Sequence, residues 1–328
     1  MPSSMTHTYF GLDVYKNLRK NYQAKIKDSI EYFKLFSQGS DPFMFYHFLI
    51  GKKAKEISEI QKRMHRTKTQ DFFLTTISYI YDNKLISNSE IMAYLYGYIC
   101  HYFLDLYTHP FIYYKGGIFK KEDKNTYKYN GLHQEIEYGI DLYFINKKEN
   151  IKAEKFKVYK EIFEVKGLTQ VLRDIIKVTI EDVYSIPRAS YYYEKSIWYM
   201  SKFFKLANYD PYGLKLKIYR LIDRITPNRV TKVKELSFYN QYPNINKHLN
   251  LNNKAWYCPW NKTNSYKSSF LDLYNMAMDK AIKTIEVITE MLERDSLDIK
   301  RLKMLFKDLS FCTGINCDKE VELKYFEF

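Results

Sequence analysis

Apolar residues recur along most of the chain at the three- and four-residue spacing of amphipathic helices. This periodicity predicts a series of helices separated by polar breaks. No alternating pattern typical of strands competes with it. Short strands within the longer loops are still compatible with the sequence. The predicted helices cover residues 10–36, 69–82, 89–107, 131–147, 155–166, 168–184, 190–206, 213–223, 268–293 and 297–309.

Helix-breaking residues are sparse, with 11 glycines and 8 prolines among 328 residues. We therefore expect an all-α fold. The first expected unit is a compact multi-helix domain over residues 1–207. A helical C-terminal region over residues 208–328 is expected to pack on the same core rather than fold independently.

Composition changes this picture little. The 33 tyrosines and 22 phenylalanines accompany abundant Lys, Asn and Ile, which is typical of a biased coding composition. The net charge of +14 would attract phosphates of nucleic acid or of an anionic membrane. Because the lysines are spread along the chain without a compact basic arm, a generally lysine-rich composition is the simpler interpretation.

The first residues, MPSSMTHTYFGLD, lack the basic and apolar regions of a secretory signal. No run of about 18 apolar residues occurs, so we expect no transmembrane segment. The four cysteines are too few for a disulfide framework. Cys312 and Cys317 would allow a bridge or a shared metal, but reduced thiols are the simpler interpretation. These features together predict a cytoplasmic protein.

Candidate chemistry is concentrated early, since six of the seven histidines lie before residue 134. In CHYFLDLYTHPF (100–111), His101 and Asp105 are four residues apart and so share one helical face. His109 continues that face. Because it precedes Pro110, we expect it at the end of the helix.

A second motif, GLHQEIEYGID (131–141), repeats the four-residue spacing with His133 and Glu137. Imidazole and carboxylate on one helical face favour zinc over calcium or magnesium. Taken singly, such pairs are more often surface contacts within a helix. Asp105, however, lies in a segment that is apolar on nearly all sides, and a buried acid needs a partner or a metal.

Five segments, in this order, resemble the zinc-dependent phospholipase C family: THTYFG, QGSDPFMFY, MHRTKTQDFF, CHYFLDLYTHPF and HQEIE. Together they span residues 1–145. Bacterial phospholipases C and S1/P1-type nucleases of this kind share an all-helical fold and a trinuclear zinc site. The resemblance therefore implies a phospholipase C/P1 nuclease-like domain with two or three bound zinc ions.

The family's metal ligands carry over to eight positions of this chain. One zinc would be held by Asp41, His65, His101 and Asp105, a second by His109, His133 and Glu137, and a third by His7 with Asp105 bridging. The family's third zinc also uses an amino-terminal Trp that has no counterpart here, which leaves two ions as the alternative.

Two roles need a choice. Asp41 resembles the family's acidic residue that acts as a general base and also binds zinc. The resemblance therefore makes Asp41 the candidate catalytic residue. Either His47 or His65 could fill the ligand position after it. We favour His65, because MHRTKTQDFF matches the segment in which the ligand precedes the next helix. His47 is then a core residue or a support for a ligand.

The resemblance implies an enzyme that hydrolyses phosphate esters with zinc-activated water. A phospholipid is favoured over nucleic acid as the phosphodiester substrate, with peripheral membrane contact as a further expectation. The alternatives are a nuclease or phosphatase on the same scaffold and a non-catalytic, metal-stabilised helical protein. A closed structural zinc site usually has four ligands, so eight candidates favour catalysis. Residues 146–328 carry no motif, and we expect His248 to be exposed and uninvolved.

Overall fold

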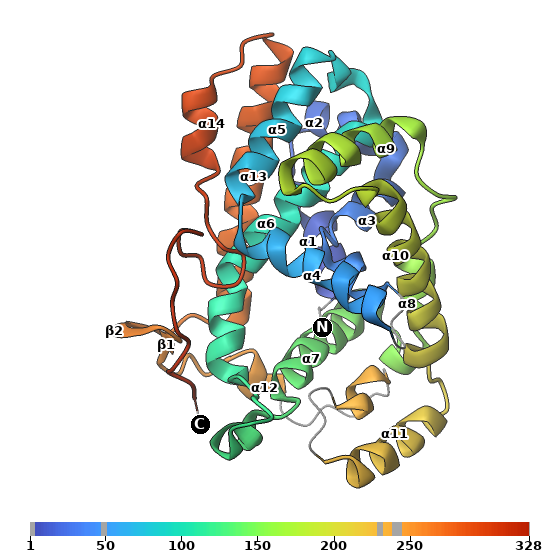
Figure 1. Cartoon of the computed structure of the whole chain (residues 1–328), viewed down its shortest axis with the longest axis vertical. Coiled ribbons are helices and arrows are strands. Elements are labelled where there is room, and N and C mark those ends of the chain that lie inside the picture. Colours follow the sequence, from blue (N-terminus) through green and yellow to red (C-terminus); the bar gives the residue numbers. More distant parts are fainter. Residues whose placement is uncertain (1–3, 47–50, 228–231, 238–244, 328) are drawn as a thin grey trace.

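The computed structural model describes residues 4–46, 51–227, 232–237 and 245–327. In this part of the chain nearly all regular structure is helical, which confirms the all-α prediction (Figure 1). The α-helices are α1 (Ser4–Asn17), α2 (Lys20–Ile26), α3 (Ile30–Phe36), α4 (Lys52–Arg66), α5 (Thr69–Asp82), α6 (Ser89–Gly116), α7 (Leu132–Glu149), α8 (Val158–Ile162), α9 (Gln170–Ile176), α10 (Ala189–Phe203), α11 (Leu214–Ile225), α12 (Ile245–His248), α13 (Phe270–Glu293) and α14 (Ile299–Leu305).

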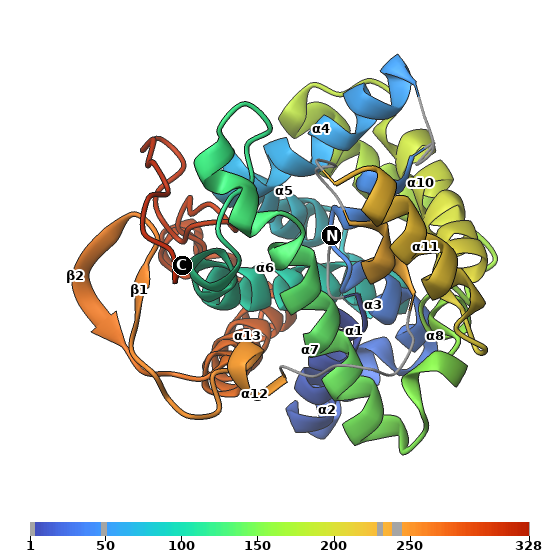
Figure 2. The same cartoon turned by 90° about the horizontal axis from the view of Figure 1, so that it is seen from below.

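Shorter elements connect these helices. A 3₁₀ turn, η2 (Asp41–Phe45), follows α3, and another, η8 (Val233–Leu236), follows α11. Wide π-helical turns extend α9 over Lys177–Asp182 and α10 over Phe204–Asn208. An antiparallel hairpin of β1 (Trp256–Cys258) and β2 (Asn261–Tyr266) projects from the side of the molecule opposite α11 (Figure 2).

The long helix α6 runs through the middle of the fold, and α13, α3, α7 and α1 all pack against it. Its sequence explains this position, because a helix that is apolar on every side is stable only when neighbours surround it. The side chain of Asn88 caps its first turn by accepting hydrogen bonds from the backbone N–H groups of Glu90 and Ile91, both at 3.1 Å.

Helix α13 covers one side of α6. Its first turn is fixed by a capping box in which Ser269 and Asp272 exchange side-chain and backbone hydrogen bonds. Farther along, the hydroxyls of Tyr96 and Thr289 meet at 2.7 Å inside the contact between the two helices. The division of the chain at residue 207 stays a prediction, but α13 lies directly on the helix that carries the first motif.

Three expectations about helices were wrong. Residues 10–36 form three helices rather than one, with a break after α1 and a 3₁₀ turn over Lys27–Ser29. Helix α4 was not predicted, because few of its residues are apolar and only a narrow stripe, including Ile57 and Ile60, is buried. Helix α6 continues past His109 through Pro110 to Gly116. Proline removes one backbone hydrogen bond, and the burial of the following turn offsets that cost.

His248 also differs from expectation. It lies in α12 with only 4% of its surface exposed, 3.9 Å from the Glu135 carboxylate. Among the helices of the described residues, none combines the length and the apolar character needed to cross a lipid bilayer.

Candidate metal centre

The carboxylate of Asp105 is the centre of a cluster of histidines. Its Oδ2 lies 3.1 Å from Nε2 of His65 and 3.4 Å from Nε2 of His101. Its Oδ1 lies 3.2 Å from Nε2 of His7 and 3.5 Å from Nε2 of His109. One carboxylate thus faces four imidazole nitrogens, two on each oxygen. The helical spacing predicted from CHYFLDLYTHPF places three of these residues on one face of α6.

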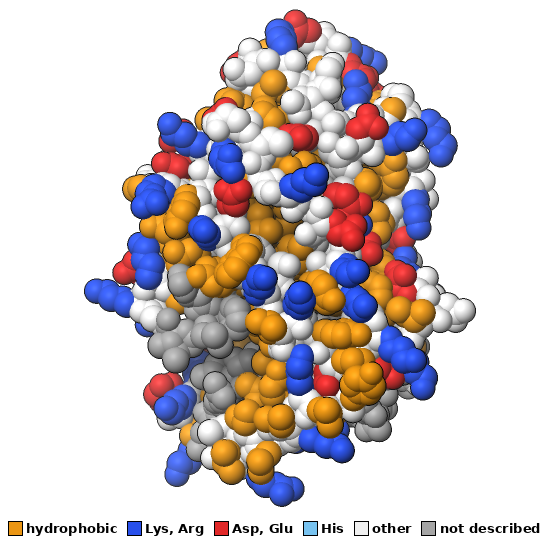
Figure 3. Space-filling view, turned by 90° about the vertical axis from the view of Figure 1, so that its right-hand side faces the viewer, with side chains coloured by type: hydrophobic (Ala, Val, Ile, Leu, Met, Phe, Trp, Pro, Cys, Tyr) orange, Lys and Arg blue, Asp and Glu red, His pale blue; other side chains and the backbone are white. Residues whose placement is uncertain are grey.

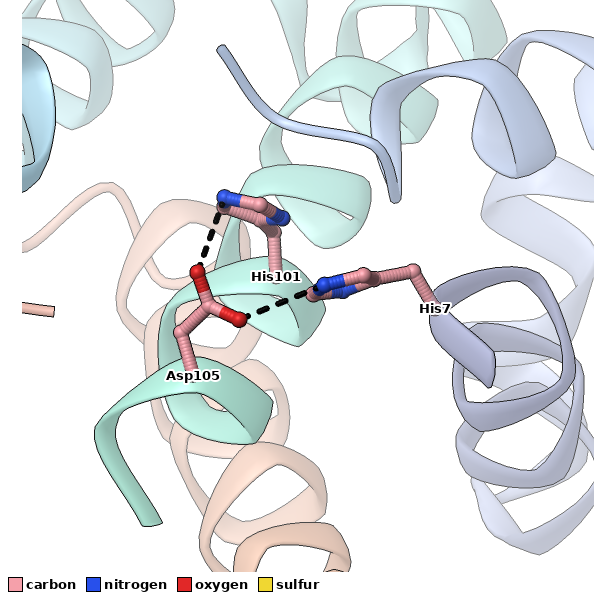
Figure 4. Close-up of side chains that lie close together, drawn as sticks. All are labelled: His7, His101 and Asp105. Atoms are coloured by element: carbon pink, nitrogen blue, oxygen red, sulfur yellow. Dashed lines mark ion pairs between the residues drawn. The ribbon is translucent and has the colours of Figure 1, made fainter. Parts of the chain in front are cut away.

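Helix α1 supplies His7, which points at Asp105 from across the site (Figure 4). Asp141 of α7 fixes the first turn of α1, because its carboxylate accepts hydrogen bonds from the backbone N–H groups of Met5 and Thr6 and from the Thr6 hydroxyl. Burial raises the pKa of Asp141 to about 7, and the three hydrogen bonds oppose that rise. Asp141 therefore holds the element that presents His7.

Asp41 and His65 enter the cluster from η2 and the end of α4. Nε2 of His65 lies 3.5 Å from Oδ1 of Asp41. Gln61, one turn before His65, donates from Nε2 to the same Asp41 oxygen at 3.0 Å. On the other side of the ring, Nδ1 of His65 lies 3.0 Å from the Gln61 carbonyl oxygen. An Nδ1–H donated to that carbonyl would leave Nε2 free to bind a metal.

The spacing of these atoms fits a shared ion. Ligand atoms about 2.0 Å from a tetrahedral zinc lie about 3.3 Å from one another. In the cluster, Nε2 of His65 and Nε2 of His101 are 3.3 Å apart, and both lie within 3.4 Å of Oδ2 of Asp105. Asp41, His65 and His101 form one group of potential ligands, and His7, His101 and Asp105 form another.

Two buried ring nitrogens add to this fit. Nδ1 of His7 and Nδ1 of His101 have no hydrogen-bond partner among the described residues. Buried polar atoms are rarely left without a partner in folded proteins. Nε2 of each ring faces Asp105, so the unpartnered Nδ1 is a second position at which each ring could bind a metal.

His133 and Glu137 form a separate pair on α7, with 3.1 Å between Nε2 and Oε1. They do not join a group of three close ligand atoms in the described part of the chain. They line the same cavity as Asp41, His65 and His109, and its volume is about 190 Å³. The structure thus places five of the eight candidate ligands on this cavity, and the other three, His7, His101 and Asp105, lie together in the adjoining cluster. His47 lies outside the described residues.

Gly39, in the QGSDP segment, makes room for His101. Its φ is +53°, and a Cβ at this position would lie 2.2 Å from Cδ2 of the His101 ring. Both the backbone conformation and the close approach require glycine. Its carbonyl oxygen accepts a hydrogen bond of 2.7 Å from the hydroxyl of Tyr193 on α10, which holds the turn in place.

The C-terminal segment contributes to the site, which the sequence did not predict. The backbone N–H of Phe311 donates to the His65 carbonyl oxygen at 2.8 Å, and Nδ1 of His109 lies 3.0 Å from the Phe311 carbonyl oxygen. The Phe311 ring packs against the rings of His65 and His101. Next in sequence, Cys312 lines the cavity. The only signal in the sequence was the pair of cysteines in FCTGINC, and all four cysteines are free thiols.

Burial and charge set the protonation of the cluster. Burial alone would raise the pKa of Asp105, but the surrounding imidazoles hold it well below its usual range. Burial, reinforced by His7 and His65, holds the pKa of His101 well below its usual range despite Asp105. An ionised carboxylate beside a neutral imidazole is the combination that metal ligation requires.

The pKa values of Asp41, His7 and His65 are raised. Burial raises the pKa of Asp41, although His65 opposes the rise. For His7 and His65, burial would lower the pKa, but Asp105 and Asp41 together raise it. The cluster therefore carries both groups that favour a proton and groups that favour its loss.

Comparison with known proteins gives one match. The sequence profile of the family described as zinc-dependent phospholipase C matches residues 6–188, more than half of the chain. Neither a curated protein nor a solved structure matches the chain. The matched range includes every residue of the Asp105 cluster, the pair His133 and Glu137, and the elements that carry them. The match confirms the resemblance read from the sequence motifs: the chain belongs to the zinc-dependent phospholipase C family.

Proposed function

We propose that this protein is a zinc-dependent hydrolase of phosphate esters, with a phospholipid as the favoured substrate. The observation that carries the proposal is the convergence of four imidazole nitrogens on the two oxygens of Asp105, next to an open cavity. A closed structural site would leave no room for a substrate, whereas a catalytic site keeps a position open.

The ligand assignment follows the two sides of Asp105. Oδ2 would share one zinc with Asp41, His65 and His101. Oδ1 faces His7 and His109, so Asp105 and these two residues would hold the remaining zinc on that side. His133 and Glu137, on the cavity wall, would complete the ligands there. This gives about two or three ions in one connected centre.

Bound zinc would activate a water molecule and neutralise charge that develops on the phosphate. The chain's own groups have separate tasks. Asp41 would orient that water and accept its proton at the carboxylate, and Gln61 keeps the carboxylate turned toward the site through its 3.0 Å hydrogen bond to Oδ1. The Phe311 ring, packed on two of the histidines, keeps bulk water from that side of the cluster.

Arg66 gives the cavity a cation for the phosphate. Its guanidinium lies beside the thiol of Cys312 and the hydroxyl of Tyr113. Burial raises the pKa of both these groups, so they stay neutral and leave the Arg66 charge available for an anion. Lys62 lies on the same wall. A positive rim beside a metal cluster suits a phosphodiester and does not by itself separate a phospholipid from a nucleic acid.

A direct comparison of substrates tests the proposal. The purified protein should hydrolyse a chromogenic phosphodiester, and phosphatidylcholine should be turned over faster than single-stranded DNA under the same conditions. Faster cleavage of DNA would replace the phospholipid with a nuclease function. Zinc binding without hydrolysis of any of the three would leave the metal-stabilised, non-catalytic alternative.

A further inference from the structure

Helix α11 presents an apolar stripe to solvent. None of its 12 residues is buried. Leu214, Ile218, Leu221 and Ile225 follow the spacing of one helical face, and between 58% and 69% of each is exposed. A helix on the surface of a protein in water normally turns such a stripe toward the core. A contiguous apolar patch of this kind marks a site of interaction.

The orientation of α11 is fixed by contacts on its other side. The hydroxyl of Tyr219 donates to the Ala207 carbonyl oxygen at 2.8 Å. The carboxylate of Asp223 accepts hydrogen bonds from the backbone N–H groups of Val233 and Lys234, both at 2.9 Å. Because these groups hold the inner face, the apolar stripe stays directed outward.

Basic residues border the stripe. Lys217, Arg220 and Arg224 are exposed, and the single acid of the helix, Asp223, is engaged by the backbone of η8. On the lower part of the face in Figure 3, where α11 lies, hydrophobic side chains alternate with Lys and Arg, and few acidic side chains separate them. An apolar face bordered by cations is complementary to a lipid surface with anionic headgroups.

The helix is connected to the start of α7, whose His133 and Glu137 line the cavity. Lys234 of η8 lies 3.8 Å from the Glu135 carboxylate on α7, two residues from His133. Just beyond the end of α11, the Pro227 carbonyl oxygen accepts a hydrogen bond from Nδ2 of Asn130 at 3.0 Å. A partner that binds the exposed stripe of α11 would therefore also lie close to the first turn of α7.

We propose that α11 is a docking surface for an anionic phospholipid membrane, with its apolar stripe inserted between the headgroups and its basic side chains on the lipid phosphates. Association with a second copy through the same face is disfavoured, because a symmetric contact would bring the basic borders of both copies together. The inference extends the proposed function from the cavity to the surface that presents it to lipid, and lipid binding is measurable without catalysis.

Sedimentation with vesicles tests the proposal. The wild-type protein should bind vesicles of phosphatidylcholine with phosphatidylglycerol more tightly than vesicles of phosphatidylcholine alone, and added salt should weaken the binding. The double variant Ile218→Asp/Leu221→Asp should bind roughly tenfold more weakly or worse. Met304→Asp is the matched control, since Met304 is 62% exposed on α14, far from α11 in Figure 1. It should bind like the wild type.

Two further readouts separate the possible outcomes. The double variant should turn over a soluble chromogenic phosphodiester as fast as the wild type, because it leaves the cavity intact. If neither protein is active, the vesicle measurement still decides the inference. Equal vesicle binding by the wild type and the double variant would overturn it. So would a wild-type dimer that the double variant dissociates, without preference for anionic vesicles.

Discussion

Nδ1 of His109 donates a hydrogen bond to the carbonyl oxygen of Phe311, 3.0 Å away, and so joins the central helix to the C-terminal segment. The bond fixes which nitrogen of His109 carries the proton and turns Nε2 toward Asp105. More than 200 residues separate the two partners, so the site depends on parts of the chain that lie far from its motifs.

Phe311→Leu should weaken zinc binding by roughly 10–100-fold, because the smaller side chain loosens the segment that orients His65 and His109. Affinity can be measured by competition with a chromogenic chelator. Phe306→Leu is the control, since Phe306 is also buried but packs on Phe73 and Tyr102. If both variants lose stability alike and neither loses zinc affinity, the C-terminal segment has no role in the site.

Gly39→Ala should lower zinc content and destabilise the fold by roughly 1–3 kcal/mol, because its Cβ would collide with the His101 ring at a positive φ. Zinc content per folded chain and the free energy of unfolding are the two measurements. Gly51→Ala separates the causes, since Gly51 also has a positive φ, but no atom of the described residues lies within 4 Å of a Cβ at this position. It should keep its zinc.

Arg66→Gln should lower kcat/KM for a phosphodiester by roughly tenfold or more while leaving zinc content unchanged, because it removes a charge-assisted contact to phosphate. The neighbouring variant Arg63→Gln is matched in chemistry, but Arg63 donates to the Tyr184 carbonyl oxygen instead of lining the cavity. Steady-state kinetics with unchanged rates for Arg66→Gln would remove this residue from the proposed function.

The burial of His248 should make the stability of the fold depend on pH. Burial, reinforced by Lys247 and Lys115, lowers its pKa to about 4. A neutral buried histidine stabilises the fold fully above its unfolded pKa of about 6.5, and this contribution falls as pH drops from there toward 4. The free energy of unfolding should fall between pH 7 and pH 4 in both proteins. In His248→Gln this fall should be smaller than in the wild type, by up to about 3 kcal/mol. Parallel unfolding curves for the two proteins would show that His248 does not contribute.

The motifs predicted the helical fold and the residues of the cluster for a clear physical reason. His101, Asp105 and His109 are spaced along one helix, and helical periodicity alone places them on one face. The backbone bias of a residue before proline was misleading at Pro110, where burial of the next turn keeps the helix intact.

Other parts of the site depend on tertiary contacts that no local pattern encodes. Gln61 and Arg66 lie on α4, whose narrow apolar stripe concealed the helix itself. Phe311 reaches the site only because the segment after α14 folds back on His65. His248 is polar and lies within an Asn-rich stretch, yet packing around α12 buries it.

Elemental analysis of zinc in the wild-type protein and in Asp105→Asn tests the central claim most directly. Asp105 faces four histidines, and its replacement by Asn keeps the size of the side chain while removing the charge that they share. The account predicts about two to three zinc ions per wild-type chain and a loss of most of them in the variant, with the helical content retained. A wild-type protein without zinc, or a variant that keeps its full zinc content, would contradict it.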